Sequence, residues 1–277
     1  MDKLKFGQKA VLAMLVLAFA AAFTLGQKGV PGRTGQNAIK RETNDVGIEE
    51  TEKSMSEEAK KEQLSDEKQL RVHREGKVLN GSLENPCVVL DAGHGGYDPG
   101  KIGINNSLEK DVNLAVTLMT KEYLEAAGVK VVMTRQEDVS LGGESEDNKK
   151  VRDLKQRIEI VESANPILAV SIHQNSYPEE YVSGAQVFYY RTSAEGRKLA
   201  AALQERLVTQ LDPTNDRQIK ENDSYYLLKK TSVPLVIVEG GFLSNWNEAV
   251  KLCDEEYQDA LAWAIYLGIM DYLETVA

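Results

Sequence analysis

The sequence predicts an α/β fold, a single domain with a mostly parallel, twisted sheet flanked by helices on both faces. From about residue 79 onward, strand patterns alternate with helical patterns of ten or more residues. Connections of that length allow neighbouring strands to run parallel. The strands at residues 88–90 and 235–238 are unbroken apolar runs, which is typical of strands that are buried on both faces.

The first half of this region predicts a strand, a helix and a second strand. Residues 87–91 are mainly aliphatic and form the first strand, and residues 129–134 form the second. The helix between them covers residues 109–127 and ends before Gly128. Its apolar face consists of Val112, Ala115, Val116, Met119, Tyr123 and Ala126.

The second half continues the alternation after a polar loop at residues 141–149. A helix at residues 151–164 turns Leu154, Ile158 and Val161 inward. The remaining elements are strands at 167–173, 185–190 and 235–238, a helix at 193–211, and helices that begin at Asn247 and at about Glu255.

The N-terminal residues differ from this region in composition. Lys3, Lys5 and Lys9 precede an uncharged run of apolar or small residues at 10–25. This order is typical of an export signal, and the run is almost long enough to remain in a membrane. We therefore expect residues 1–26 to be a signal peptide or a membrane anchor.

The next segment, residues 27–78, is crowded with charge and poor in large aliphatic residues. Such a composition cannot bury enough apolar surface to fold alone, so we expect a charged flexible spacer. The folded, functional domain then covers residues 79–277.

Composition excludes some partners and sites. The net charge of −10 argues against nucleic acid as a partner, because phosphate binding requires clustered lysine and arginine. Cys87 and Cys253 are far apart and form no CxxC motif, so neither a thiol metal site nor a disulfide framework is expected. Both cysteines are expected in the core.

Three residues of metal-binding types lie at or just after the ends of predicted strands. His94 lies in a glycine-rich turn after the first strand, His173 ends another strand, and Glu239 ends a third. In a parallel sheet these strand ends meet at one edge, where open α/β folds bind ligands. Two histidines and a carboxylate with an open fourth position describe a catalytic zinc site.

Spacing alone does not identify the carboxylate ligand. The candidates are Glu239, Asp91, Asp98, Glu109 and Asp111. Glu109 and Asp111 begin a helix, where a negative charge is favourable to the helix dipole without any metal.

Four motifs connect these residues to a known family. They are DAGHGG at 91–96, LEKDVNL at 108–114, SIHQN at 171–175 and VEGGFLSN at 238–245. In this order they resemble the motifs of the zinc-dependent N-acetylmuramoyl-L-alanine amidases of the amidase-3 family. Two positions depart from the family pattern: Ala92 stands where proline is usual, and Gly240 where valine is usual.

The resemblance implies a role for each motif residue. His94, Glu109 and His173 correspond to the zinc ligands, and Glu239 corresponds to the catalytic carboxylate. Beside these, we expect Asp91 to orient a ligand histidine and Asn175 to contact the substrate.

The implied activity is hydrolysis of the amide bond between N-acetylmuramic acid and L-alanine in peptidoglycan. The short layout resembles the germination-specific cortex amidases of spore formers, which implies spore cortex as substrate during sporulation or germination. The protein would be exported to the cell envelope, either anchored by its N-terminal segment or secreted after signal cleavage. No activating partner protein can be identified from the sequence.

Two alternatives remain. The chain could be an amidase-like module that binds peptidoglycan without cutting it, or a zinc peptidase that acts on the stem peptide. A pure binding module has no need of the proton-transferring carboxylate, so the presence of Glu239 favours an enzyme.

Overall fold

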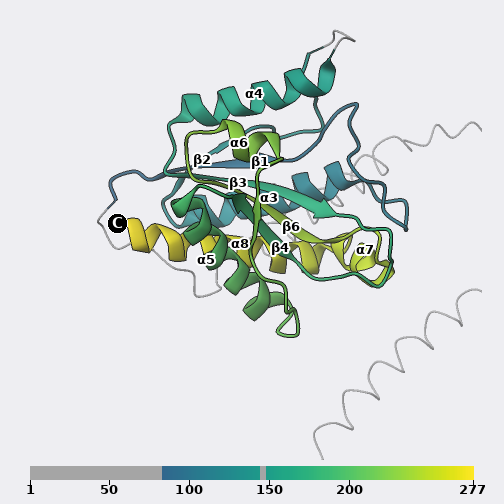
Figure 1. The fold of residues 1–277 in the computed structure, drawn as a ribbon. Coiled ribbons are helices and arrows are strands. Elements are labelled where there is room, and N and C mark those ends of the chain that lie inside the picture. The colour runs from purple at the N-terminus through teal and green to yellow at the C-terminus, as the bar shows by residue number, and fades with distance from the viewer. Residues whose placement is uncertain (1–82, 144–147) are drawn as a thin grey trace, which may run out of the picture. The chain divides into compact units, whose positions relative to one another are not determined.

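A six-stranded sheet forms the centre of the protein in the computed structural model, which describes residues 83–143 and 148–277 (Figure 1). The strand order is β2-β1-β3-β6-β4-β5. The strands are β1 (Cys87–Ala92), β2 (Lys130–Met133), β3 (Leu168–Asn175), β4 (Gln186–Tyr190), β5 (Lys220–Asn222) and β6 (Leu235–Phe242). The strands β2, β1, β3 and β6 run parallel, whereas β4 pairs antiparallel with β6 and carries β5 at the edge. The predicted mostly parallel sheet is therefore confirmed.

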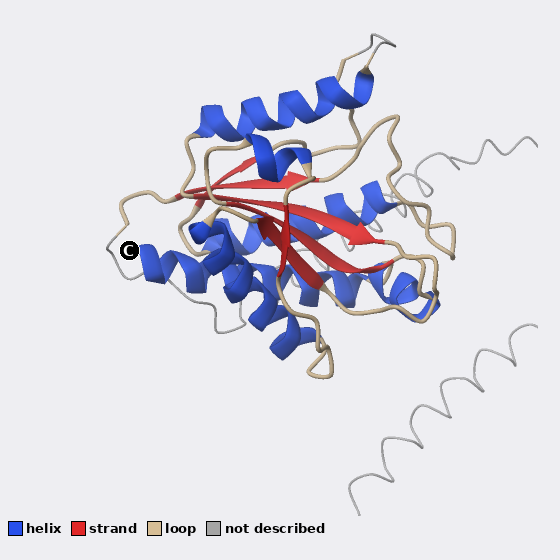
Figure 2. Ribbon diagram, in the orientation of Figure 1, coloured by secondary structure: helices blue, strands red, loops and turns tan. Residues whose placement is uncertain are grey.

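Helices cover both faces of the sheet, as predicted (Figure 2). One face carries α3 (Glu109–Ala126), α5 (Ala194–Leu211) and α8 (Glu255–Val276). The other face carries α4 (Lys149–Ala164) and the short α6 (Tyr226–Lys230), and α7 (Trp246–Leu252) follows β6. No helix of the described residues is both long and apolar enough to cross a membrane.

Alternate side chains of each central strand point to opposite faces of the sheet. Val88 and Leu90 belong to the core under α3, α5 and α8, whereas Val89 lies between them and packs toward α4 and α6. Because successive side chains of a strand point to opposite faces, a strand covered on both sides must be apolar throughout. This explains the unbroken apolar runs in the sequence.

The boundaries correct the sequence interpretation at two strands. β3 continues to Asn175 and β6 continues to Phe242, so His173 and Glu239 lie inside their strands and not at the ends. Gly240, which follows Glu239, serves close packing within the strand. A Cβ atom there would lie 2.7 Å from Leu261 Cδ2 and 2.8 Å from Gln174 Oε1.

The expectations for the two cysteines and for two short elements need correction. Cys253 is exposed and follows the last residue of α7, and Cys87 is half-buried, so neither is a core residue. The sequence interpretation also missed β5 and α6, whose segments are too short to show a periodic pattern. The expected signal or anchor at 1–26 and the spacer at 27–78 lie outside the described residues.

A buried ion pair joins the sheet to α4. Asp91 and Arg157 are 0% and 2% exposed, and Arg157 Nη1 donates to Asp91 Oδ1 over 2.6 Å. The hydroxyl groups of Thr134 and Ser171 also donate to this carboxylate. Burial alone would raise the pKa of Asp91, but Arg157 and the two hydroxyl donors lower the pKa to about 2. Since this folded-state pKa lies below the ordinary 3.8, the stabilisation is present above about pH 4 and is lost as the pH falls toward 2.

We expect Asp91→Asn to lower the free energy of unfolding by about 3 kcal/mol at pH 7, because the buried Arg157 loses its ionic partner. The difference from the wild type should narrow by about 1 kcal/mol at pH 3, because the unfolded wild-type chain already binds a proton at Asp91 there, whereas the folded chain mostly does not. Urea denaturation at both pH values measures this. Asp223→Asn, which breaks an exposed ion pair with Arg191, is the control. It should lower the free energy of unfolding by less than about 1 kcal/mol. Equal effects of the two substitutions would contradict this assignment.

Candidate metal centre

The turn after β1 presents His94 in a left-handed backbone conformation, with φ of 62°. Non-glycine residues adopt this conformation rarely, so surrounding bonds must hold it. Arg157 Nη2 donates to the His94 carbonyl oxygen over 2.6 Å, and Arg135 Nη2 donates to the Gly93 carbonyl oxygen over 3.0 Å. Two buried guanidinium groups therefore fix the turn.

Gly93 allows the second histidine to approach this turn. A Cβ atom at Gly93 would lie 2.2 Å from His173 Cε1, so no other residue type leaves room for the imidazole. The two imidazole rings meet edge to face, with centroids 4.9 Å apart. The turn and β3 are thus packed so that the histidines share one site.

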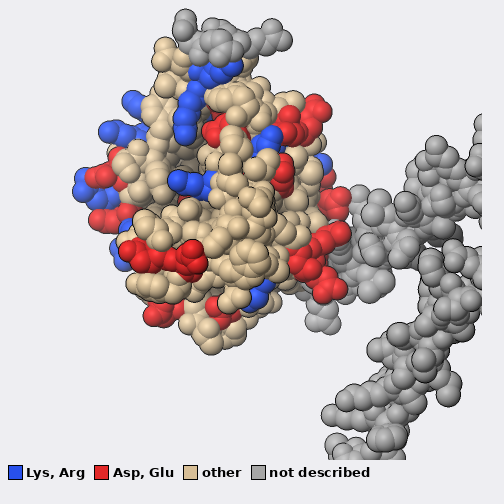
Figure 3. All heavy atoms as spheres, turned by 90° about the vertical axis from the view of Figure 1, so that its right-hand side faces the viewer, with Lys and Arg blue, Asp and Glu red and all other residues tan. Residues whose placement is uncertain are grey.

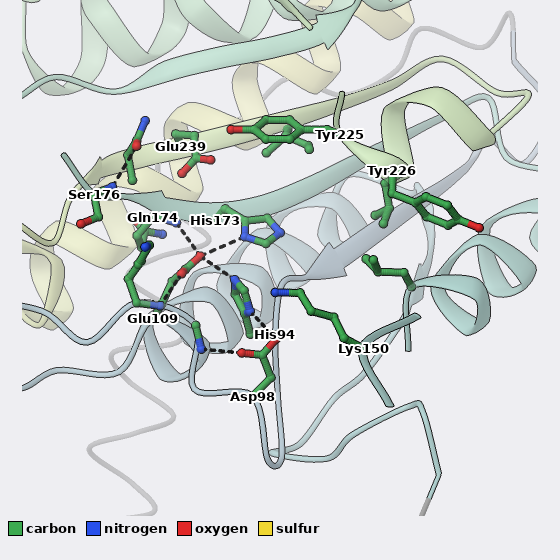
Figure 4. Close-up of a pocket in the computed structure, with 16 residues that line it drawn as sticks. His94, Asp98, Glu109, Lys150, His173, Gln174, Ser176, Tyr225, Tyr226 and Glu239 are labelled. Carbon is green, nitrogen blue, oxygen red and sulfur yellow. Dashed lines mark hydrogen bonds and ion pairs between the residues drawn. The ribbon is translucent and has the colours of Figure 1, made fainter. Parts of the chain in front are cut away.

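Glu109 completes the group from the first turn of α3. Its Oε1 atom lies 2.9 Å from His173 Nδ1 and 3.2 Å from His94 Nε2 (Figure 4). One ligand atom from each of the three residues lies within 4.8 Å of the others, which is close enough to hold a metal ion. Imidazole nitrogens and a carboxylate oxygen form a donor set that suits zinc.

The electrostatics of the group suit a cation. Burial would raise the pKa of Glu109, but the two histidines lower it far below its usual range. Burial lowers the pKa of His94, and Glu109 and Asp98 more than compensate, so this pKa is raised. This arrangement of one ionised carboxylate and two imidazoles is the one expected around a metal ion.

Asp98 supports His94 from the side away from Glu109. Its Oδ2 atom lies 3.0 Å from His94 Nδ1, and its Oδ1 atom accepts a hydrogen bond from the Gly100 amide over 3.1 Å. A carboxylate behind a ligand histidine fixes the ring orientation and increases its basicity. The sequence interpretation gave this role to Asp91, which contacts Arg157, Thr134 and Ser171 and makes no hydrogen bond with either histidine among the described residues.

Glu239 approaches from the neighbouring strand. It pairs with His173 in the register of β3 and β6, so both side chains point to the face covered by α4 and α6. The carboxylate is 8% exposed, and its Oε2 atom has no hydrogen-bond partner among the described residues. Burial raises the pKa of Glu239 to about 7.

A cavity of about 550 Å³ lies in front of these groups. His94, Glu109, His173, Asn175 and Glu239 all line it. Asn175 lies at the end of β3, where its Oδ1 atom accepts a hydrogen bond from the Ser176 amide. Asp98, a candidate carboxylate, also lines the cavity, whereas the sequence interpretation did not anticipate Lys101, Lys150, Leu154, Tyr225 and Tyr226 as lining residues. Of the five candidate carboxylates, Asp91 and Asp111 do not line the cavity, and Asp111 is exposed.

Comparison with known proteins decides the family. Residues 88–271 match the profile of the amidase-3 family, which is described as N-acetylmuramoyl-L-alanine amidase. The chain belongs to this family. It is therefore an enzyme, a peptidoglycan amidase, as the four sequence motifs implied.

Relatives of the amidase cover most of its folded region. The germination-specific N-acetylmuramoyl-L-alanine amidase of Bacillus subtilis is 39% identical over 193 residues, which are 69% of this chain and 81% of the relative. The CwlD amidase of Clostridioides difficile, solved in complex with the GerS lipoprotein, is 42% identical, with a TM-score of 0.67, and covers 69% of this chain and 100% of its own. An amidase of Nostoc punctiforme is 34% identical, with a TM-score of 0.61 and coverage of 69% and 98%. These neighbours confirm the predicted fold.

We expect Asp98→Asn to weaken metal binding by about 10- to 100-fold, because His94 loses the charged group that orients it. Calorimetric titration of the metal-free amidase with Zn²⁺ measures this. Asp111→Asn removes the same charge from an exposed position nearby and should leave the affinity unchanged. Unchanged affinity in Asp98→Asn would contradict the orienting role.

Proposed function

We propose that this amidase is a zinc enzyme in which His94, Glu109 and His173 hold the ion and Glu239 transfers protons. The observation that carries the proposal is the convergence of the three ligand atoms within 4.8 Å, beside the buried carboxylate of Glu239, whose Oε2 atom has no partner in residues 83–143 and 148–277. A zinc ion in such a set lowers the pKa of water to about 7 and polarises a carbonyl group.

The protein groups have distinct tasks in the proposed hydrolysis. Glu239, with a pKa of about 7, accepts a proton from the attacking water as the water oxygen adds to the amide carbonyl. It then donates that proton to the nitrogen of L-alanine as the carbon–nitrogen bond breaks. The products are the free carboxyl group of the lactyl side chain and a stem peptide with a free amino terminus. Asn175, on the cavity wall, is proposed to contact the substrate.

The proposed substrate is spore cortex peptidoglycan. The identity of 39% with an amidase named as germination-specific, across 81% of that relative, supports this narrower role. We propose further that residues 1–26 direct export to the cell envelope as a signal peptide or anchor, and that residues 27–78 are a spacer before the catalytic domain at 79–277. The CwlD structure contains a lipoprotein, so an exported lipoprotein is the class of partner to test.

We expect Glu239→Gln to retain zinc and to lose activity by at least about 100-fold, because general acid–base transfer is lost. His173→Ala should lose both zinc and activity, because a ligand is missing. Metal analysis of the purified variants and mass spectrometry of digested peptidoglycan measure these outcomes.

The same digest separates the alternatives. An amidase releases intact stem peptides that begin with L-alanine, whereas a stem peptidase releases fragments and a binding module releases nothing. A Glu239→Gln enzyme with near wild-type turnover would contradict the assignment of Glu239 as the base. Undiminished activity after removal of all metal would sink the zinc proposal.

We expect the full chain to release stem peptides several times faster from purified spore cortex than from vegetative peptidoglycan of the same organism. Mass spectrometry of both digests over time measures the two rates. Equal rates on both walls would restrict the conclusion to a general peptidoglycan amidase.

A further inference from the structure

Lys150 is a charged residue of the cavity that the proposed chemistry does not use. It lies near the start of α4 and lines the cavity, and its side chain points toward His94 (Figure 4). Asp98 and the proposed ligands His94, Glu109 and His173 line the same cavity, so the ammonium group faces the proposed metal centre.

The rotation of α4 directs Lys150 into the cavity. Lys150, Leu154 and Arg157 are spaced by four and three residues, so they share one face of the helix. Leu154 lines the same cavity, and Arg157 is fixed by its bonds to Asp91 and to the His94 turn. Lys155 lies on another face, is exposed and does not line the cavity.

The ammonium group of Lys150 has no hydrogen bond or ion pair with any residue in the ranges 83–143 and 148–277. The anionic groups around it are engaged elsewhere, since Asp98 contacts His94 and Glu109 contacts both histidines. In the space-filling view, this side of the molecule is hollowed, and lysine and arginine side chains lie at the edge of the hollow (Figure 3).

The charged groups that line the cavity and the proposed metal ion together favour an anionic ligand. The two lysines that line it, Lys101 and Lys150, balance the carboxylates of Asp98 and Glu109. A divalent metal ion adds two positive charges, and Glu239 in its ionised form offsets one of them. A surplus of positive charge in a cleft with apolar walls attracts an anionic ligand.

We propose that Lys150 binds a carboxylate of the stem peptide, namely the free α-carboxylate of the γ-linked D-glutamate that follows L-alanine. The inference rests on the proposed amidase site and adds a determinant of substrate specificity. The glycan on the other side of the scissile amide is uncharged, so only the peptide offers a carboxylate. Two extended residues span about 7 Å, which places this carboxylate within reach of a lysine on the wall of a 550 Å³ cavity. Lysine suits the task as a point charge on a flexible stem.

Two substrates that differ only in this carboxylate test the proposed contact with Lys150. We use two muropeptides that contain N-acetylmuramoyl-L-alanyl-γ-D-glutamyl-L-lysine, one with the glutamyl α-carboxylate free and one with it amidated. The wild-type full-length enzyme should prefer the free carboxylate by about tenfold in kcat/KM, expressed mainly in KM. Lys150→Gln should raise KM about tenfold for the free carboxylate and have no further effect on the amidated substrate, so the preference disappears.

Two further variants control for charge and for folding. Lys150→Arg should retain most of the preference, because it keeps the positive charge. Lys155→Gln makes the same neutralisation on the same helix outside the cavity and should behave as the wild type. Zinc content should be equal in all of these proteins.

A second measurement does not depend on turnover. The zinc-loaded wild-type protein should bind the free tripeptide L-alanyl-γ-D-glutamyl-L-lysine, which lacks the scissile amide, more tightly than its amidated counterpart, and Lys150→Gln should bind both equally. The proposal is overturned if Lys150→Gln lowers kcat/KM equally for both muropeptides, or if the wild type does not distinguish them. Failure of the zinc mechanism gives a different result, because the wild type would then cleave neither substrate when loaded with zinc.

Discussion

The buried pair of Asp91 and Arg157 is the interaction on which the geometry of the site depends. Its carboxylate belongs to the central strand β1 and its guanidinium to α4. The same guanidinium bonds to the carbonyl oxygen of His94, so one side chain links the sheet, the helix and the turn that presents a candidate ligand. A buried ion pair adds little net stability compared with an apolar pair, but it fixes partners in one register. Here that register sets both the left-handed conformation of His94 and the rotation of α4.

The second constraint is that side chains of the site pack closely against the backbone. Glycines, which have no side chain, allow this. Gly93 leaves room for the His173 ring, and Gly240 leaves room for the Gln174 side chain behind it. Gln174 in turn donates to Asn113, which donates to Glu109, so the space at Gly240 is connected to the carboxylate between the histidines. The replacement of the usual valine by glycine at this position is therefore accommodated by a neighbouring polar side chain.

The sequence predicts the fold well because its strands are covered on both faces and must be apolar throughout, as in Val88–Leu90 and Leu235–Val238. It also indicates that His94 and His173 meet at one edge. Spacing could not choose among five carboxylates, because the choice depends on where the chain turns between β1 and α3. The four family motifs favoured Glu109, and the structure brings it to the histidines. Asp98 was named only as a candidate ligand, and Lys150 was missed, because their roles depend on a turn and on a helix rotation, which no periodic pattern reveals.

The two buried carboxylates that line the cavity, Glu109 and Glu239, experience opposite environments. Glu109 is held between two imidazoles and keeps its charge, which suits a ligand. Glu239 is also buried, but its Oε2 atom has no hydrogen-bond partner among the described residues, and burial raises its pKa to about 7, which suits a group that accepts and returns a proton near neutral pH. A pair of carboxylates whose pKa values are pushed apart in one cavity divides the tasks of an acid–base site. The difference arises from backbone position: Glu109 begins α3 and reaches both histidines, whereas Glu239 lies within β6 beside His173, where no described residue donates to its Oε2 atom.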